Sequence, residues 1–234
     1  MPQKKKHLFF DLDDTVTLSR SAIDTDMYEL MKRLPYDLII ISGARSTQIR
    51  KQVGELPLYV LGQNGNEAYA PDGRILWEEL LTDAQTAHIH EHIGSIRALT
   101  THEVAREDDL IEHRGSQISY SLIGHNEHVE RKKAFDPDRA IRRHLLDNVP
   151  LVSEHIEVKI GGTTCFDYFM KGRHKGFNVA RLIDHMGWNK DDAVYYGDAL
   201  VPGGNDEAVI GVIDTILVRN HRDTYEHLKK YENP

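Results

Sequence analysis

Apolar and polar positions repeat with two different periods along the first third of the chain. Three short apolar runs, HLFFDL at 7–12, DLIIIS at 37–42 and PLYVLG at 57–62, are typical of buried strands. Residues 24–34 and 45–53, which lie between them, carry apolar side chains at the spacing of amphipathic helices. This order of strand and helix predicts a parallel sheet. The following stretch, AYAPDGRILW, predicts a hairpin because Pro-Asp-Gly suits a tight turn.

The strict alternation stops near Leu81 and returns after Lys175. Between these points the pattern predicts a helix at 81–99, strands at 110–114 and 117–123, a helix at 137–149, and strands through Val158 and Phe169. After Lys175 it predicts a helix at 176–187, a strand at 193–198, a helix after Asn205, a strand at 215–218 and a last helix near Tyr225. We therefore expect an α/β fold with a doubly wound parallel-sheet core at 1–80 and 172–234, interrupted by an α+β insert at 81–171.

Composition indicates a soluble, cytoplasmic protein. The 234 residues are 40% hydrophobic and 28% charged, no apolar stretch approaches the length that spans a bilayer, and no signal-peptide pattern follows MPQKKK. The only cysteine, Cys165, excludes an internal disulfide and a multi-cysteine zinc site. A net charge of −8 argues against a nucleic-acid partner but leaves room for a local basic pocket that binds a small anion.

Two acidic residues follow the first apolar run. Asp11 and Asp13 are two residues apart after a buried strand, so in extended geometry their side chains share a face at the carboxyl end of the sheet. Ligands of open α/β sheets bind at that edge. Two carboxylates at one place repel each other unless a cation or a proton joins them, which predicts Mg²⁺ with oxygen ligands. The alternative without a function is a turn at the end of the strand whose acids are solvated.

Three later stretches carry side chains suited to a phosphate. Ser42 ends the second strand, where its hydroxyl and the N–H groups after it, beginning with Gly43, can hold a phosphate oxygen. Lys175 begins a helix, where a cation is unfavourable unless an anion lies nearby. Asp198 follows a buried strand and could bind metal. Each is also consistent with an ordinary cap or surface turn.

A glycine-rich loop follows Asp198. Its glycines let the backbone approach closely, and Gly204, Asn205 and Asp206 stand before the predicted helix. Asn-Asp is also an ordinary helix cap.

In order, Asp-x-Asp, Ser, Lys and Gly-Asp resemble the four motifs of the haloacid dehalogenase superfamily. The resemblance implies Asp11 as the nucleophile that forms an aspartyl phosphate and Asp13 as general acid and base. It also implies Ser42 and Lys175 on the phosphoryl oxygens. Mg²⁺ would be held by Asp11, the Asp13 carbonyl and Asp198, supported by the loop that carries Gly204, Asn205 and Asp206. The insert then corresponds to the superfamily's larger α/β cap.

Longer stretches are similar to the eukaryotic-type phosphomannomutases across nearly the whole chain. They are TVTLSR, RGSQISYSLIGH, GGTTCFDYFMKGRHK and the GGND after GDALVP. The similarity implies a sugar phosphate as partner, with Arg20 and Arg114 on its distal phosphate. Lys132 or neighbouring Arg131 stands near a position where the family usually has another arginine. It also implies sugar contacts at the positions of Thr163, Cys165 and Asp167. The sequence does not fix the oligomeric state, and a homodimer through the cap is one arrangement.

Several positions depart from that family. His125 stands where the IGR stretch has arginine, Ser119 replaces an asparagine, and Thr163 and Cys165 replace a more polar pair. Histidine lacks arginine's permanent, planar charge and grips phosphate less firmly. A mutase must hold a bisphosphorylated intermediate while it turns around, whereas a phosphatase need only admit water. We therefore expect phosphosugar hydrolysis, with interconversion of mannose 6-phosphate and mannose 1-phosphate as the alternative and a non-catalytic phospho-switch or sugar-phosphate sensor as a remote third.

Overall fold

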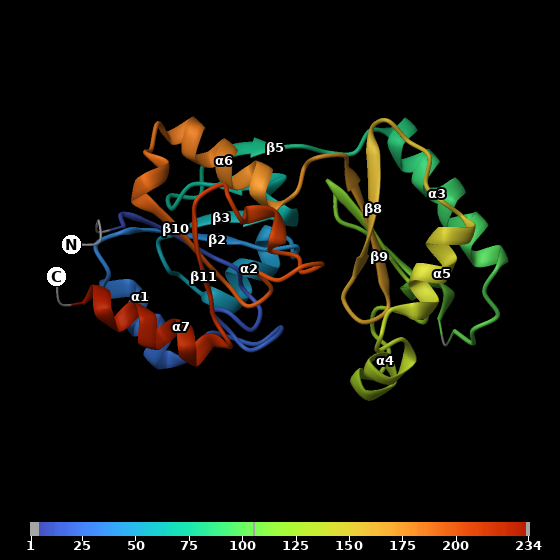
Figure 1. Ribbon diagram of the computed structural model, residues 1–234, viewed down its shortest axis with the longest axis horizontal. Helices are drawn as coiled ribbons and strands as arrows, with labels where there is room; N and C mark the ends of the chain where they lie inside the picture. The colour runs from blue at the N-terminus through green and yellow to red at the C-terminus, as the bar shows by residue number, and fades with distance from the viewer. Residues whose placement is uncertain (1–4, 105, 233–234) are drawn as a thin grey trace. The chain divides into compact units, whose positions relative to one another are not determined.

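The chain forms two compact units in a computed structural model that describes residues 5–104 and 106–232. The core consists of the chain up to Glu78 and from Arg173, and the cap is Glu79–Gly172 (Figure 1). The insert predicted at 81–171 differs from the observed cap by two residues at one end and one at the other. The chain therefore leaves the core sheet once and returns to it once.

Seven strands make the core sheet, in the order β11-β10-β1-β2-β3-β4-β5. The neighbours from β11 to β3 pair in parallel, while β4 and β5 form an antiparallel hairpin at one edge. Apolar runs, β-branched in β2, build the central strands, because these are buried on both faces. The strands are β1 His7–Phe10, β2 Asp37–Ile41, β3 Tyr59–Gly62, β4 Glu67–Tyr69, β5 Ile75–Glu78, β10 Ala193–Gly197 and β11 Asp214–Leu217.

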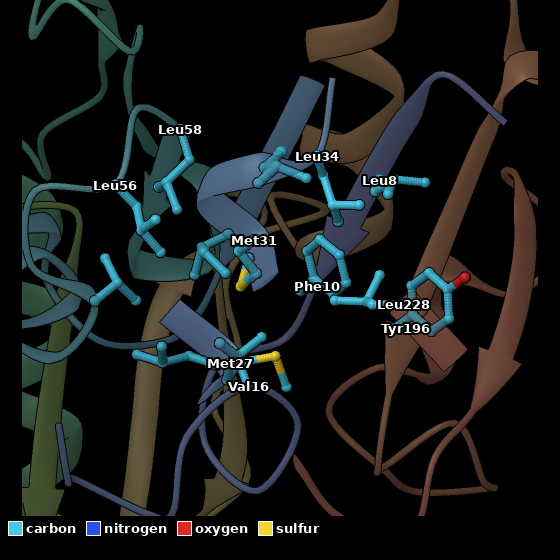
Figure 2. Packing of buried hydrophobic residues seen from close by; sticks show 14 of the residues in the cluster. Leu8, Phe10, Val16, Met27, Met31, Leu34, Leu56, Leu58, Tyr196 and Leu228 are labelled. Atoms are coloured by element: carbon cyan, nitrogen blue, oxygen red, sulfur yellow. The ribbon is translucent and has the colours of Figure 1, made fainter. Parts of the chain in front are cut away.

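Helices cover both faces of this sheet, as the prediction of a doubly wound core requires (Figure 1). One face packs against α1 Thr25–Arg33, α2 Ser46–Val53 and α7 His221–Leu228, and the other against α6 Lys175–Met186. Successive strand residues alternate between the faces, so Phe10 and Tyr196 join the first layer and Phe9 and Tyr195 the second. Figure 2 shows the first layer, in which Phe10 stacks on Tyr196.

The cap is a four-stranded antiparallel sheet with helices on one face. The sheet order is β6-β7-β9-β8, and the apolar side chains of α3 and α5 pack against strand residues such as Tyr120 and Phe166. A capping box between Thr82 and Gln85 begins α3. The elements are α3 Asp83–Ala98, β6 Ile111–His113, β7 Gln117–Ser121, α4 Val129–Phe135, α5 Ala140–Asn148, β8 Ile156–Gly161 and β9 Cys165–Met170.

Two predicted helices differ from the structure. The single helix expected at 137–149 is α5 alone, preceded by the unpredicted α4. The chain breaks between them because the buried Asp136 carboxylate accepts from the N–H groups of Ile141 and Arg142 and pairs with the Arg142 guanidinium at 2.7 Å. The helix expected after Asn205 is only a 3₁₀ turn. The 3₁₀ turns are Gln63–Gly65, Glu107–Asp109, Lys190–Asp192, Glu207–Val209 and Lys229–Tyr231.

Within the part of the chain that the structure describes, every helix is too short or too polar to cross a bilayer.

Candidate active site

Three carboxylates meet at the carboxyl edge of the core sheet. Asp11 directly follows β1, and its N–H continues the parallel ladder by donating to the Tyr196 carbonyl at 2.9 Å. Asp198 follows the neighbouring β10, and Asp206 comes from the loop beyond it. Each residue contributes a carboxylate oxygen to a group in which all the oxygens lie within 4.8 Å of one another. Hard oxygen ligands at this spacing suit a divalent cation such as Mg²⁺.

Lys175 holds two of these acids together. Its side chain is 1% exposed, and its Nζ donates to Asp11 Oδ1 at 2.5 Å and to Asp206 Oδ1 at 2.7 Å. Close packing at the start of α6 brings the lysine there, because a Cβ atom on Gly176 would lie 1.8 Å from the Ala208 carbonyl oxygen. The anion that the sequence predicts near this lysine is therefore a pair of buried carboxylates.

Burial and mutual repulsion dominate the electrostatics of the cluster. The pKa of Asp11 is raised to about 7, mainly by burial and also by repulsion from Asp206, while Lys175 opposes the rise. The pKa of Asp198 is also raised, first by burial and then by Asp206. Burial alone would lower the pKa of Lys175, but attraction to Asp11 and Asp206 holds it above its usual range. One ammonium group against three carboxylates leaves excess negative charge, which a divalent cation would neutralise.

The Asp13 side chain does not join the three carboxylates. Its Oδ1 accepts from the Arg20 N–H at 2.7 Å and from Gln52 Nε2 at 3.1 Å. Within the described chain, no residue hydrogen-bonds Oδ2, so this atom is available to give or take a proton. The arrangement is compatible with the predicted acid–base role and with a metal contact made through the Asp13 carbonyl.

Ser42 is a buried residue at the start of the loop that follows β2. Its N–H donates to the Leu61 carbonyl at 3.0 Å, and its Oγ accepts from the Ala44 N–H at 3.1 Å. The N–H of Gly43 has no acceptor among the described residues and can therefore serve an anion. The N–H of Ser46, the first residue of α2, is already taken by the Glu67 carboxylate at 2.5 Å.

The loop that carries Gly204, Asn205 and Asp206 contributes unequally. A Cβ atom on Gly204 would lie 1.9 Å from the Ala199 carbonyl oxygen, so only glycine lets the loop fold back. Asn205 is exposed, whereas Asp206 is fully buried and accepts from Tyr195 Oη at 2.6 Å as well as from Lys175. Asp206 is therefore a central member of the site.

The remaining predicted residues lie mostly on the cap. Register places Glu112, Ser119, Asp167 and Lys159 in one row across the four strands, on the face opposite α3 and α5. Ser119 Oγ donates to Asp167 Oδ1 at 2.6 Å. Cys165 shares this face, and Thr163 is exposed in the turn before β9. The cap sheet thus presents a polar face.

Most basic residues expected to bind the distal phosphate have partners within the cap. Arg114 donates to the Glu112 carboxylate at 2.6 Å and 3.0 Å. His125 is buried and donates from Nε2 to the Ser119 carbonyl at 3.1 Å, while its Nδ1 lies 3.9 Å from Cys165 Sγ. Lys132 Nζ donates to the His125 carbonyl at 2.8 Å. On the core, the Arg20 side chain is exposed.

Sequence reasoning missed three residues that support the acids. Thr15 Oγ1 accepts from the Asp198 N–H at 3.1 Å and lies 3.3 Å from Asp198 Oδ1. Tyr195 donates to Asp206, and Gln52 donates to Asp13. Thr15 follows the acidic stretch directly and could have been suspected, whereas Tyr195 and Gln52 read as ordinary strand and helix residues.

A doubly wound core with these acids, the serine loop and the buried lysine defines a phosphotransferase of the haloacid dehalogenase superfamily. The chain is similar over 97% of its length to the crystal structure of a haloacid dehalogenase-like hydrolase from Bacteroides thetaiotaomicron, with 99% of that chain covered, a TM-score of 0.63 and 15% identity. At this identity the likeness shows the fold.

The chain belongs to the eukaryotic phosphomannomutase family, whose pattern matches residues 35–232. It is 26% identical to a phosphomannomutase of Triticum aestivum over 240 residues, which covers 94% of this chain and 92% of the relative. It is 28% identical to phosphomannomutase 2 of Dictyostelium discoideum over 225 residues, covering 88% of this chain and 87% of the relative. The predicted resemblance is confirmed, and these relatives favour the mutase alternative over the hydrolysis that the sequence analysis preferred.

Proposed function

We propose that the chain interconverts mannose 6-phosphate and mannose 1-phosphate by passing a phosphoryl group through Asp11. The observation that carries this proposal is the contact of Lys175 with Asp11 and Asp206 in a fully buried cluster. A carboxylate attacks an anionic phosphate poorly until nearby positive charge cancels the repulsion. Lys175 provides part of that charge, and family membership favours a hexose phosphate as substrate.

In the first half-reaction an Asp11 carboxylate oxygen attacks one phosphorus of a hexose bisphosphate, the bond from that phosphorus to the ester oxygen breaks, and a hexose monophosphate leaves. Asp13 gives its proton to the departing sugar oxygen, and its Oδ2 is the atom available for this. The Ser42 hydroxyl and the Gly43 N–H bind the phosphoryl oxygens. In the second half-reaction Asp13 takes a proton from the free hydroxyl of a hexose monophosphate, which attacks phosphoryl-Asp11, regenerates the carboxylate and forms the bisphosphate again.

Mg²⁺ fits this donor set and would be held by Asp11, Asp198 and the Asp13 carbonyl, with Asp206 as a supporting acid. When bound, it supplies positive charge to the phosphoryl oxygens. The residues of the chain bind and orient the substrate and move the proton.

We further propose that the polar face of the cap sheet recognises the sugar and its distal group. Arg114 provides a guanidinium paired with Glu112, and Ser119 and Asp167 in the same row as Glu112 carry hydroxyl and carboxylate groups suited to sugar hydroxyls. Cys165 belongs to the same face, and Thr163 is exposed in the turn that leads into β9. A homodimer through the cap and a cytoplasmic location remain part of this proposal.

Hydrolysis is the second candidate, and His125 favours it. The imidazole is engaged by a backbone carbonyl and lies against a thiol, so it does not replace the arginine grip that a bisphosphate would need. If the cap releases the sugar monophosphate before its hydroxyl attacks, water reacts with phosphoryl-Asp11 instead of a sugar hydroxyl.

Product analysis separates the two candidates. The protein is incubated with Mg²⁺, mannose 1-phosphate and a hexose bisphosphate activator, and both mannose 6-phosphate and inorganic phosphate are followed near neutral pH. The proposal expects more isomer than phosphate. More phosphate than isomer would establish hydrolysis, and neither product would contradict phosphotransfer on this substrate.

A further inference from the structure

The turn after β3 holds an unusual backbone conformation next to the serine loop. Gln63, Asn64 and Gly65 have φ angles of 52°, 60° and 90°. The left-handed region is natural for glycine, but it costs a residue with a side chain on the order of 1–3 kcal/mol. Such conformations persist only where the surrounding structure fixes them, and they cluster at functional sites. The turn is therefore a place to look for a residue that acts on the substrate.

Hydrogen bonds fix this turn from two sides. The N–H groups of Gln63 and Asn64 donate to the carbonyls of Ala44 and Ser42, both at 2.8 Å. From α6, Asn178 Nδ2 donates to the Asn64 carbonyl at 2.9 Å. The turn is thus tied both to the loop that carries Ser42 and to the helix that begins with Lys175.

The Asn64 side chain takes no part in this network. A Cβ atom on Gly43 would lie 3.6 Å from Asn64 Oδ1, so the amide group is beside the loop expected to bind phosphate. Asn64 is half-buried, and among the described residues its side-chain amide has no hydrogen-bond partner. Glycine would adopt the same φ without strain, so backbone geometry alone does not call for asparagine here.

We propose that Asn64 is a substrate-contacting residue whose side-chain amide donates a hydrogen bond to a non-bridging oxygen of the phosphoryl group. The assignment rests on the proposed function of the Asp11 site and extends it. Asn64 follows β3, which pairs with β2, so it stands one strand beyond Ser42 in the same edge of the sheet. A neutral donor held there would bind a phosphoryl oxygen without entering the charge balance of the carboxylates.

Asn64→Gly tests the role, because it deletes the amide and removes the backbone strain. We expect kcat/KM to fall about 10- to 100-fold, the range for losing a hydrogen bond to a charged group. The loss should be similar for mannose 1-phosphate and p-nitrophenyl phosphate, which share only the phosphoryl group. The matched control is Arg139→Gly, a cap position with a φ of 60°, which should leave turnover unchanged.

Asn64→Asp provides a second variant of the same size that tolerates the left-handed backbone but cannot donate. It should lose more activity than Asn64→Gly, because a carboxylate repels phosphate. Inorganic phosphate binding in the presence of Mg²⁺, measured by calorimetry, should weaken in both variants. Thermal unfolding of each variant reports whether it folds.

The outcomes separate this inference from the proposed function. An inactive wild type would contradict the function of the whole site. An active wild type with a folded, fully active Asn64→Gly variant would overturn the role of Asn64 alone. A loss confined to mannose 1-phosphate would place Asn64 on the sugar and overturn the phosphoryl contact.

Discussion

Lys175→Met replaces the buried ammonium group with an apolar side chain of similar length. In the structure Lys175 Nζ lies 2.5 Å from Asp11 and 2.7 Å from Asp206, and all three side chains are buried. Removing one partner of a buried ion pair leaves the other as an uncompensated charge, which costs about 3–5 kcal/mol. Because one cation here serves two carboxylates, we expect the loss in unfolding free energy to lie at the upper end of that range for the metal-free protein.

The same substitution should also reduce turnover. Burial raises the pKa of Asp11 to about 7, and Lys175 is the strongest influence that lowers it. Without the lysine the pKa of Asp11 rises further, so less of the carboxylate is ionised at neutral pH and fewer molecules carry a nucleophile. The phosphoryl oxygens also lose a cation, so we expect kcat to fall by a factor on the order of 100 or more.

Urea denaturation of the metal-free protein measures the first effect, and p-nitrophenyl phosphate turnover with Mg²⁺ measures the second. Adding Mg²⁺ should narrow the stability difference because the ion supplies charge to the same acids. The control is Lys190→Met, which removes an exposed lysine and should change stability by no more than about 0.5 kcal/mol. A Lys175→Met variant as stable as the wild type without metal, or as active with it, would refute the reasoning.

Other changes test the site piece by piece. Asp11→Asn should fold and abolish turnover, and substantial residual activity would contradict its role as nucleophile. Asp13→Asn should affect substrates with poor leaving groups more than p-nitrophenyl phosphate, and an equal loss on both would argue against the acid role. Arg114→Ala should raise KM for mannose 1-phosphate but scarcely affect p-nitrophenyl phosphate, and equal effects would place the arginine elsewhere. Because the pKa of Asp11 is about 7 against an ordinary value of 3.8, this carboxyl binds more protons in the folded metal-free protein than in the unfolded chain between those values. The contribution of Asp11 to stability, measured against Asp11→Asn, should therefore fall as the pH rises from 4 to 7, and Mg²⁺ binding by calorimetry should weaken as the pH falls below 7; a flat profile for both would contradict the shift.

Much of the core was predictable because buried parallel strands have a simple sequence pattern. Apolar runs such as HLFF and LIII mark β1 and β2, and a polar residue that directly follows such a run must lie at the edge of the sheet. Asp11, Ser42 and Asp198 all stand in that position, so their placement at one edge follows from pattern alone.

Other features depend on contacts that the sequence does not display. Asp206 is followed by a 3₁₀ turn instead of a helix, and the clamp by Lys175 is a long-range contact. The helix α4 carries the charged sequence VERKKAF, which has little apolar periodicity. Asn64-Gly65 suits a left-handed turn, but the sequence does not show that this turn is bound to the Ser42 loop and to Asn178. Such features arise from packing between segments far apart in the chain.

Phosphorylation of Asp11 tests the central claim most directly. The protein is mixed with Mg²⁺ and mannose 1-phosphate that carries a labelled phosphoryl group, quenched rapidly in acid, and digested for mass spectrometry. Label should appear on the peptide that contains Asp11, should be removed by hydroxylamine as expected of an acyl phosphate, and should be absent from Asp11→Asn. Turnover of the substrate with label on another residue, or with full labelling of Asp11→Asn, would contradict the account.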